Sequence, residues 1–348
     1  MCELVDLTIV LDAIEDHPRV FPKGAIEVLQ DLNWTTFSEF SEKMFDLLFQ
    51  VGKADLSVGR IYEGHVNALI LINTYGSSQQ KQRYFSEARE GKLFGVWNTE
   101  NPEDGLKITA NYNSKGLFLK GSKTFCSGAL HIDRPIVTAK TKDGVQMLVL
   151  NLDEQNALQE DWSQWDPIGM RPSVSCRIDF TSFEIFREEY LGKINDYYKE
   201  PHFSWGAVRF SAVQLGGAQK IADTMLQHLQ KTHRSKNSIQ QMRIGKVAIL
   251  METGRLWMER ASNIENGRDI NYSDDHRVNF SNMMRTMVLE LCEKVILLAE
   301  KAVGIQGTMK SHPLERPIRD LRVYLKQAGP DAALAQVGNY TDNRKTYE

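Results

Sequence analysis

The feature that most constrains the fold is a helical period of apolar residues that continues from about Phe203 almost to the end of the chain. Apolar residues recur there at steps of three and four, which places them on one face of an α-helix. Three stripes follow one another, and they consist of Ala212, Leu215, Gly216, Ala222, Met225, Leu226 and Leu229, then Ile244, Val247, Ala248, Met251, Arg255 and Met258, then Met284, Met287, Val288, Leu291, Val295, Leu298, Ala299 and Ala302. Three long helices and a terminal one predict a four-helix bundle, whose core is built from such stripes.

The first 92 residues also follow a helical period, whereas the middle of the chain does not. From residue 93, short stretches rich in β-branched and aromatic residues alternate with turns such as Asn113-Ser114-Lys115-Gly116 and Lys142-Asp143-Gly144. The expected strands are Leu93–Asn98, Leu117–Lys120, Pro135–Lys140, Met147–Leu152 and Cys176–Ile185. The sequence therefore predicts an α+β protein with an N-terminal helical domain (1–92), a middle β-domain (93–198) and a C-terminal helical bundle (199–348).

Composition narrows the classes of function. The 348-residue chain has a net charge of −3 and a pI near 6.3, so no basic surface indicates a nucleic-acid partner. Four cysteines stand singly, without the paired spacing of a metal site. The N-terminus has no cationic start before an apolar core, and no run approaches the roughly 18 apolar residues of a membrane span. We therefore expect a soluble cytoplasmic protein without a bound metal.

The segment from Gly304 to Leu334 carries an ordered set of short motifs. It contains two glycines three residues apart, followed by His312-Pro313, Glu315-Arg316, Arg319-Asp320 and Gly329-Pro330. This order resembles the C-terminal region of the acyl-CoA dehydrogenase family of flavoproteins, which typically has GGNG, [YH]P-[VL]-ER, RD and EGT. The resemblance implies an acyl-CoA dehydrogenase-like fold with FAD as the cofactor, and structural rather than catalytic roles for the charged pairs.

Two segments of the middle domain extend the resemblance. Gly95–Glu100, GVWNTE, is similar to the family's strand that ends in a [ST]-E-P turn, although the proline comes one place later, at Pro102. The glycine-rich loop that follows in the family is shortened to Glu103-Asp104-Gly105. Leu119–Gly128, LKGSKTFCSG, is similar to the family pattern L-x-G-x-K-x-[WF]-[IC]-[TS]-[NG].

These segments supply the candidate flavin contacts. The resemblance implies that Asn98 and Thr99 meet the pyrimidine side of the flavin, that Phe125 packs against the ring, and that Ser127 bonds near flavin N5. An aromatic side chain suits the apolar face of the ring, and a hydrogen bond at N5 tunes its chemistry. Without the family, the same residues predict an ordinary strand and turn and a β-hairpin with a buried Phe.

The bundle supplies the remaining candidates. Arg209 stands where relatives often place an arginine near the active site, so it is a candidate substrate ligand, but a single helical arginine also suits a salt bridge. Arg234 is the candidate partner for the FAD diphosphate of a neighbouring subunit. Gly304, Gln306 and Gly307 suit a close approach of backbone to cofactor, or simply a helix end and a turn. The resemblance thus implies a homodimer or homotetramer.

The catalytic base of the family has no clear counterpart. Ala328 occupies the usual glutamate position before the last glycine, and no acidic residue occurs between His202 and Gln219, where some relatives carry the base instead. Asp331 is the nearest carboxylate and therefore the candidate replacement. A positioned base supplies a factor of about 10²–10⁴ in rate, so its loss would change the reaction.

Three functions remain open at this point. The first is FAD-dependent dehydrogenation at the CH–CH group of an acyl thioester, such as an acyl-CoA, with electrons passed to a transfer partner. The second is a flavin-dependent monooxygenase on the same fold, since some relatives without the glutamate have that activity. The third is a flavin-binding protein without turnover.

Overall fold

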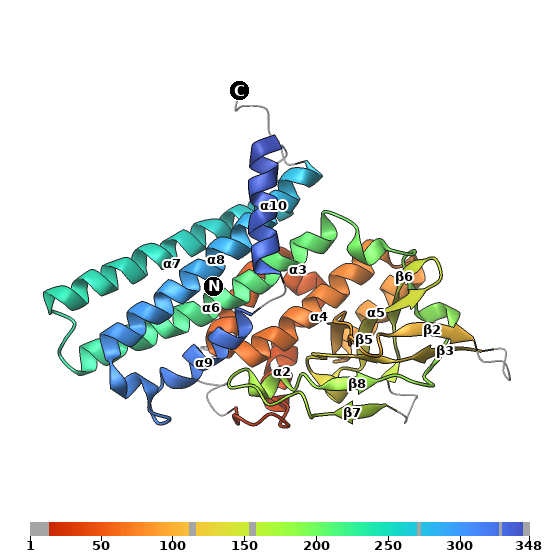
Figure 1. Ribbon diagram of the computed structural model, residues 1–348, viewed down its shortest axis with the longest axis horizontal. Coiled ribbons are helices and arrows are strands. Elements are labelled where there is room, and N and C mark those ends of the chain that lie inside the picture. The colour runs from red at the N-terminus through yellow and green to blue at the C-terminus, as the bar shows by residue number, and fades with distance from the viewer. Residues whose placement is uncertain (1–13, 111–115, 153–157, 270–272, 327–328, 344–348) are drawn as a thin grey trace.

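The computed structural model describes residues 14–110, 116–152, 158–269, 273–326 and 329–343 (Figure 1). Helices precede the first strand: α2 (Lys23–Asp31), α3 (Phe37–Ala54), α4 (Leu56–Tyr75) and α5 (Ser78–Arg89). The boundary between α3 and α4 is set by Asp55, whose carboxylate accepts hydrogen bonds from the amides of Ser57 (2.8 Å) and Val58 (2.9 Å). An N-cap of this kind satisfies amides that have no partner within the helix.

The middle of the chain forms two sheets. The strands are β1 (Phe94–Trp97), β2 (Lys107–Ala110), β3 (Leu117–Lys120), β4 (Ser122–Lys123), β5 (Arg134–Thr141), β6 (Gly144–Val149), β7 (Gln159–Asp161), β8 (Arg177–Asp179), β9 (Glu184–Ile185) and β10 (Tyr190–Leu191). The larger sheet has the order β10-β6-β5-β2-β3-β9, with β1 pairing in parallel with β5, and the smaller has the order β4-β8-β7. A bridge between Glu100 and Lys123, and a hydrogen bond of 3.1 Å from the amide of Thr124 to the backbone oxygen of Thr99, join the end of β1 to the Leu119–Gly128 segment.

Three long helices return after the strands: α6 (His202–Lys231), α7 (Ser238–Glu265) and α8 (Asp274–Val303). They run alongside one another on the side of the molecule away from the sheets, and α10 (Pro330–Asn343) stands across one end of them (Figure 1). The shorter α9 (Glu315–Tyr324) leads back toward α4. No helix within the described ranges has both the length and the apolarity needed to cross a bilayer.

The contact between α3 and α6 depends on glycine. A Cβ built at Gly216 would overlap the carbonyl oxygen of Phe49 and lie 2.6 Å from the amide nitrogen of Lys53. A Cβ at Gly52 would overlap the backbone of Val213 in the same way. The two helix backbones therefore touch directly, and only residues without a side chain fit at this crossing.

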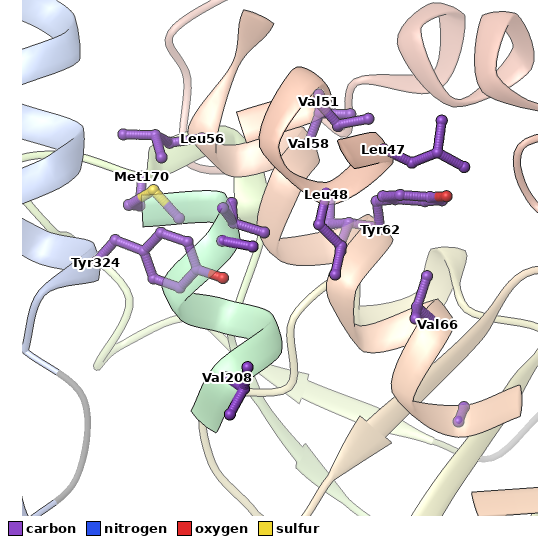
Figure 2. Close-up of a cluster of buried hydrophobic side chains, with 14 of the residues drawn as sticks. Leu47, Leu48, Val51, Leu56, Val58, Tyr62, Val66, Met170, Val208 and Tyr324 are labelled. Atoms are coloured by element: carbon purple, nitrogen blue, oxygen red, sulfur yellow. The ribbon is translucent and has the colours of Figure 1, made fainter. Parts of the chain in front are cut away.

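A buried apolar core joins the helices to the strands. Figure 2 shows the part of this core that lies among the helices. Leu48 of α3, Val66 of α4, Val208 of α6 and Tyr324 of α9 pack together there, with Met170 from the loop after β7. Burial of each large apolar side chain contributes roughly 1.5–3 kcal/mol. The core continues through all three predicted domains, so the boundaries at 92/93 and 198/199 stay a prediction.

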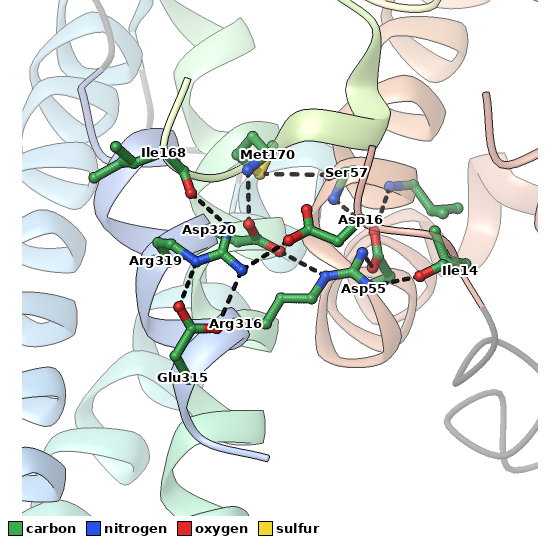
Figure 3. A network of polar contacts seen from close by, with 11 residues as sticks. Ile14, Asp16, Asp55, Ser57, Ile168, Met170, Glu315, Arg316, Arg319 and Asp320 are labelled. Atoms are coloured by element: carbon green, nitrogen blue, oxygen red, sulfur yellow. Dashed lines mark hydrogen bonds and ion pairs between the residues drawn. The ribbon is translucent and has the colours of Figure 1, made fainter. Parts of the chain in front are cut away.

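The charged motif of the C-terminal segment ties distant parts of the chain together (Figure 3). Arg316 donates to Asp55 at 2.7 Å and to the carbonyl oxygen of Ile14, and Arg319 pairs with Asp16 (2.8 Å) and Glu315. Asp320 accepts the amide of Met170 at 2.6 Å, and burial raises its pKa to about 6. In the structure these charged groups bind protein atoms.

Several expected elements differ from the structure. The single strand expected at Cys176–Ile185 is two short strands in different sheets, because Thr181 and Ser182 form a turn in which Ser182 has φ of 73°. In α7, Ala248 and Arg255 are exposed, and Gly254 is buried in their place. The expected turn at Lys142-Asp143 is confirmed between β5 and β6, whereas Asn113, Ser114 and Lys115 of the other expected turn lie outside the described residues.

Candidate functional site

A cavity of about 410 Å³ lies where the N-terminal helices, the larger sheet and the bundle meet. Its walls come from α4, the end of β1, the segment after β4, the start of α6, the middle of α8 and α10. Small-molecule sites usually measure about 300–1,000 Å³, so the cavity is large enough for one. We call it the sheet cavity.

Two residues predicted from the strand-end motif line the sheet cavity. Asn98 follows β1, and its side-chain oxygen accepts from the hydroxyls of Thr138 (2.7 Å) and Tyr198 (3.2 Å). Thr99 also lines the cavity and is exposed. The buried ammonium of Lys123 donates to the backbone oxygen of Asn98 (3.0 Å) and to Glu100 (2.6 Å). These hydrogen bonds fix the position of the strand end, while Thr99 stays exposed on the cavity wall.

Phe125 presents its ring to the sheet cavity with 57% of its surface exposed. Its backbone has φ of 53°, a conformation that side-chain-bearing residues rarely adopt and that commonly marks functional sites. Ser127 accepts a hydrogen bond from the hydroxyl of Ser175 at 3.0 Å, and its backbone oxygen accepts from the indole of Trp97 at 2.9 Å. The expectation of a buried Phe in a hairpin is wrong, because this ring faces the cavity.

Other aromatic side chains surround the same opening. Phe203 of α6 lines the cavity and is 44% exposed. Tyr198 does not line it, but its ring centroid lies 5.3 Å from that of Phe203. Tyr197 packs against both rings, and burial raises the pKa of its phenol. Large exposed aromatic surfaces gathered around a cavity are typical of a ligand-binding site.

A chain of polar side chains forms the α4 wall of the sheet cavity. Arg60 donates to Glu63, Asn67 donates to the other carboxylate oxygen of Glu63, and Arg209 donates to the side-chain oxygen of Asn67. Burial alone would lower the pKa of Arg60, but the adjacent Glu63 carboxylate raises it above the usual value. Arg209 is itself almost fully buried, and it lines a different cavity.

Sequence reasoning missed the three α4 residues. The available signal was their spacing: Arg60, Glu63 and Asn67 stand at steps of three and four in an otherwise apolar helix. A polar stripe of that kind on a buried helix indicates an internal polar site, because buried charges require partners. Asn282 and Arg285 of α8 also line the cavity and had no sequence signal.

Four predicted cofactor residues lie at the other end of the bundle. Arg234 follows the C-terminus of α6 and donates to the backbone oxygen of Ala302 at 3.0 Å. Gly304 ends α8 with φ of 78°, and Gln306 and Gly307 lie in the short helix that follows. Since α6 has 30 residues, this end is roughly 45 Å from the start of α6. These residues cannot complete the sheet cavity of their own chain.

The described residues offer the sheet cavity no carboxylate that lacks a hydrogen-bond donor from the protein. Ala328 lies outside the described residues, and Asp331 is exposed at the start of α10, where it lines a smaller cavity of about 140 Å³. The two carboxylates that the described chain places on the sheet cavity are Glu63 and Glu200. Both carboxylate oxygens of Glu63 accept hydrogen bonds, one from Arg60 and the other from Asn67. Glu200 accepts hydrogen bonds from the hydroxyl of Ser204 at 2.7 Å and from its amide at 3.1 Å. Among the residues described, no group of His, Cys, Asp and Glu could hold a metal ion.

Comparisons with known proteins support the fold described above. The family model of the acyl-CoA dehydrogenase C-terminal domain matches residues 197–337. Mitochondrial isovaleryl-CoA dehydrogenase of Solanum tuberosum is 24% identical over 297 residues, which cover 80% of this chain and 70% of that protein.

Two solved structures show the same fold over nearly the whole chain. One is TdsC from Paenibacillus sp. A11-2 in complex with FMN and indole (TM-score 0.84, 17% identity, 98% of this chain and 96% of that chain). The other is butyryl-CoA dehydrogenase from Megasphaera elsdenii (TM-score 0.79, 17% identity, 93% and 91%). The predicted fold class is confirmed: the chain has an acyl-CoA dehydrogenase-like fold, and its residues 197–337 match the model of that family's C-terminal domain.

Proposed function

We propose that this chain is a flavin-dependent oxidoreductase that oxidises a polar small molecule with molecular oxygen, as a monooxygenase does. The sheet cavity is the proposed flavin site. The residues fit the ring of a flavin, because Phe125 and Phe203 offer exposed aromatic surface, and the strand end at Asn98 and Thr99 offers fixed polar groups. When bound, a reduced flavin supplies electrons to molecular oxygen.

One observation favours oxygen chemistry over dehydrogenation. Both carboxylates on the described walls of the sheet cavity, Glu63 and Glu200, are already engaged by protein donors. A carboxylate that abstracts a proton needs a lone pair directed at the substrate, within hydrogen-bond reach. These residues therefore suit binding and orientation of a substrate rather than removal of its α-proton. The structurally similar TdsC is a dibenzothiophene monooxygenase, which accords with this proposal.

Dehydrogenation of an acyl thioester remains the second candidate. The observation in its favour is the sequence likeness to acyl-CoA dehydrogenases, which for the rat short-chain enzyme extends over 92% of this chain at 22% identity. In that case the base has to come from a residue such as Asp331. An electron-transfer partner would then be required to reoxidise the flavin.

We further propose that the flavin is FAD and that the protein is a homo-oligomer. Arg234, Gly304, Gln306 and Gly307 lie far from the sheet cavity of their own chain, so they can serve a cofactor only in a neighbouring copy. Glycine at these positions allows the close backbone approach that a diphosphate needs. FMN, which TdsC binds, lacks the part of FAD that would reach them.

Spectroscopy and oxygen consumption test the proposed reaction. We expect a yellow protein that consumes oxygen when a reductase supplies reduced flavin, and whose oxidised flavin is not bleached by a panel of acyl-CoAs under anaerobic conditions. Anaerobic bleaching by an acyl-CoA would instead establish dehydrogenation. A colourless protein that cannot be reconstituted with FAD or FMN would exclude both, and chromatography of the released flavin decides between FAD and FMN.

A further inference from the structure

A second cavity, of about 230 Å³, lies between α3, the C-terminal half of α4 and the start of α6. The end of α7 and the start of α8 complete its walls. None of the residues described along its walls also lines the sheet cavity. We call it the helix cavity. A side-chain hydrogen bond links the two cavities: Arg209 on the helix cavity donates to Asn67 on the sheet cavity.

Arg209 is the central group of the helix cavity. It is 5% exposed, and its single hydrogen bond within the described chain is the one from Nε to Asn67. No carboxylate of the described residues lies within 4 Å of its guanidinium, and burial lowers its pKa despite the more distant charges of Glu265 and Glu63. A buried guanidinium without a contacting counter-ion is unfavourable, so a fold that retains one commonly uses it to bind something.

Two further donors stand on the same walls. The guanidinium of Arg277 lies 5.7 Å over the ring of Trp205, and among the described residues it donates to the backbone oxygen of Ile264 at 3.2 Å. The indole nitrogen of Trp205 is buried and has no acceptor among the described residues. Glu265 is the one carboxylate that the described chain contributes to the lining. Two arginines against one glutamate leave an excess of positive charge.

We propose that the helix cavity is a binding site for a small carboxylate, with Arg209 and Arg277 as its ligands. A planar guanidinium can donate two parallel hydrogen bonds to a carboxylate, which an ammonium cannot do. One water occupies about 30 Å³ of liquid, so the helix cavity has room for a carboxylate with a short chain. Because Arg209 donates to Asn67, an anion bound to Arg209 would be connected through these two side chains to the polar residues of the α4 wall of the sheet cavity.

Calorimetric titration of the flavin-loaded protein with glutarate, and with neutral glutaramide as the matched control, tests this site. We expect glutarate to bind and glutaramide not to bind. Arg277→Gln should weaken glutarate binding on the order of tenfold, since hydrogen bonds to charged groups are the strong ones. Glu265→Gln should tighten binding severalfold, because it removes the competing negative charge.

Arg255→Gln is the control variant. Arg255 is exposed on α7 and pairs with Glu252 and Glu259, so its removal should leave the affinity for glutarate unchanged. Arg209→Lys keeps the charge but loses the planar fork, and it should weaken binding. Absence of glutarate binding, or changes in the same direction for Arg277→Gln and Glu265→Gln, would overturn the proposal. These two variants keep the test valid if a change at the buried Arg209 prevents folding.

The flavin absorption spectrum identifies the source of the carboxylate. If the helix cavity receives the anionic end of the substrate, glutarate should inhibit oxidation competitively and shift the spectrum. If it receives a free carboxylate, glutarate should bind without competing with substrate. Calorimetry does not depend on flavin turnover, so failure of this inference is distinguishable from failure of the proposed reaction.

Discussion

At the scale of single residues, Phe125 decides whether the sheet cavity holds the flavin. Its ring is 57% exposed and lines the cavity, so Phe125→Ala should weaken flavin binding by about three- to tenfold, the value of one aromatic contact. Fluorescence titration of the flavin-free protein measures this affinity. Phe186→Ala is the matched control, because Phe186 is 45% exposed but does not line this cavity. Equal losses in the two variants would contradict the assignment.

His65 predicts how the stability of the fold depends on pH. Its Nδ1 accepts from the amide of Phe94 at 3.1 Å, so Nε2 carries the proton and donates to the backbone oxygen of Thr35 at 2.7 Å. Burial lowers the pKa of His65 to about 4, whereas an unfolded histidine has a pKa of about 6.5. Between these values the unfolded chain holds one more proton, so the free energy of unfolding falls by about 1.4 kcal/mol per unit as the pH drops.

Denaturant unfolding at several pH values tests the role of His65. In His65→Gln, the decrease in stability between pH 6.5 and 4 should be smaller than in the parent protein. Asp320 acts in the opposite direction, because its raised pKa of about 6 makes the folded state bind a proton more tightly as the pH falls. Asp320 is present in both proteins, so the difference between them isolates His65. Parallel pH profiles would show that the His65 pKa is not depressed.

At the scale of helices, two glycines in the bundle should respond oppositely to the same substitution. Gly216→Ala inserts a methyl group between α6 and the backbone of α3, and we expect a loss of at least 1–3 kcal/mol in the free energy of unfolding. Gly245→Ala on α7 meets nothing within 4 Å and should gain about 0.5–1 kcal/mol through helix propensity. Chemical denaturation of both variants measures the pair, and a neutral Gly216→Ala would refute the direct backbone contact.

The exposure of individual residues on α7 shows what the apolar pattern of this helix could and could not predict. The period of apolar residues correctly predicted a helix, but it selected Ala248 and Arg255 as inward-facing. The helix has apolar residues on two faces: one packs on the bundle through Val247, Gly254 and Met258, and the other faces outward. Periodicity identifies a helix well, but with two apolar faces it cannot identify the one that meets the core.

At the scale of the whole molecule, the outward face of α7 predicts self-association. The helix α7 lies at the outer edge of the three long helices (Figure 1). Its spacing puts Ile239, Met242, Ile249 and Leu256 on one side, where they are 53–68% exposed. An exposed apolar stripe of this length is typical of a protein–protein contact. The double variant Met242→Glu/Ile249→Glu should therefore shift the protein from oligomer to monomer.

Light scattering after size-exclusion chromatography measures that change. Ile168→Glu is the control, because Ile168 is 68% exposed but lies outside α7, and it should leave the mass unchanged. If oligomers also complete the FAD site, the double variant should lose FAD in parallel with its loss of assembly. A parent protein that is monomeric at all concentrations would contradict both this prediction and the assignment of Arg234 to a neighbour's cofactor.

The sequence by itself determined the order of helical and β-segments and the strand at Leu117–Lys120. Only the family resemblance indicated that Asn98, Thr99 and Phe125 share a site, and the structure places them on one cavity. The order of the segments and the strand follow from the residue pattern, which is local along the chain. Only the tertiary structure joined Arg209 to Asn67, 142 residues earlier, and Arg316 to Asp55, 261 residues earlier. It also directed Arg209 to the helix cavity and left Arg60 and Glu63 on the sheet cavity. The physical reason is that such contacts depend on how α4, α6 and α9 pack, and packing involves residues that no local pattern relates.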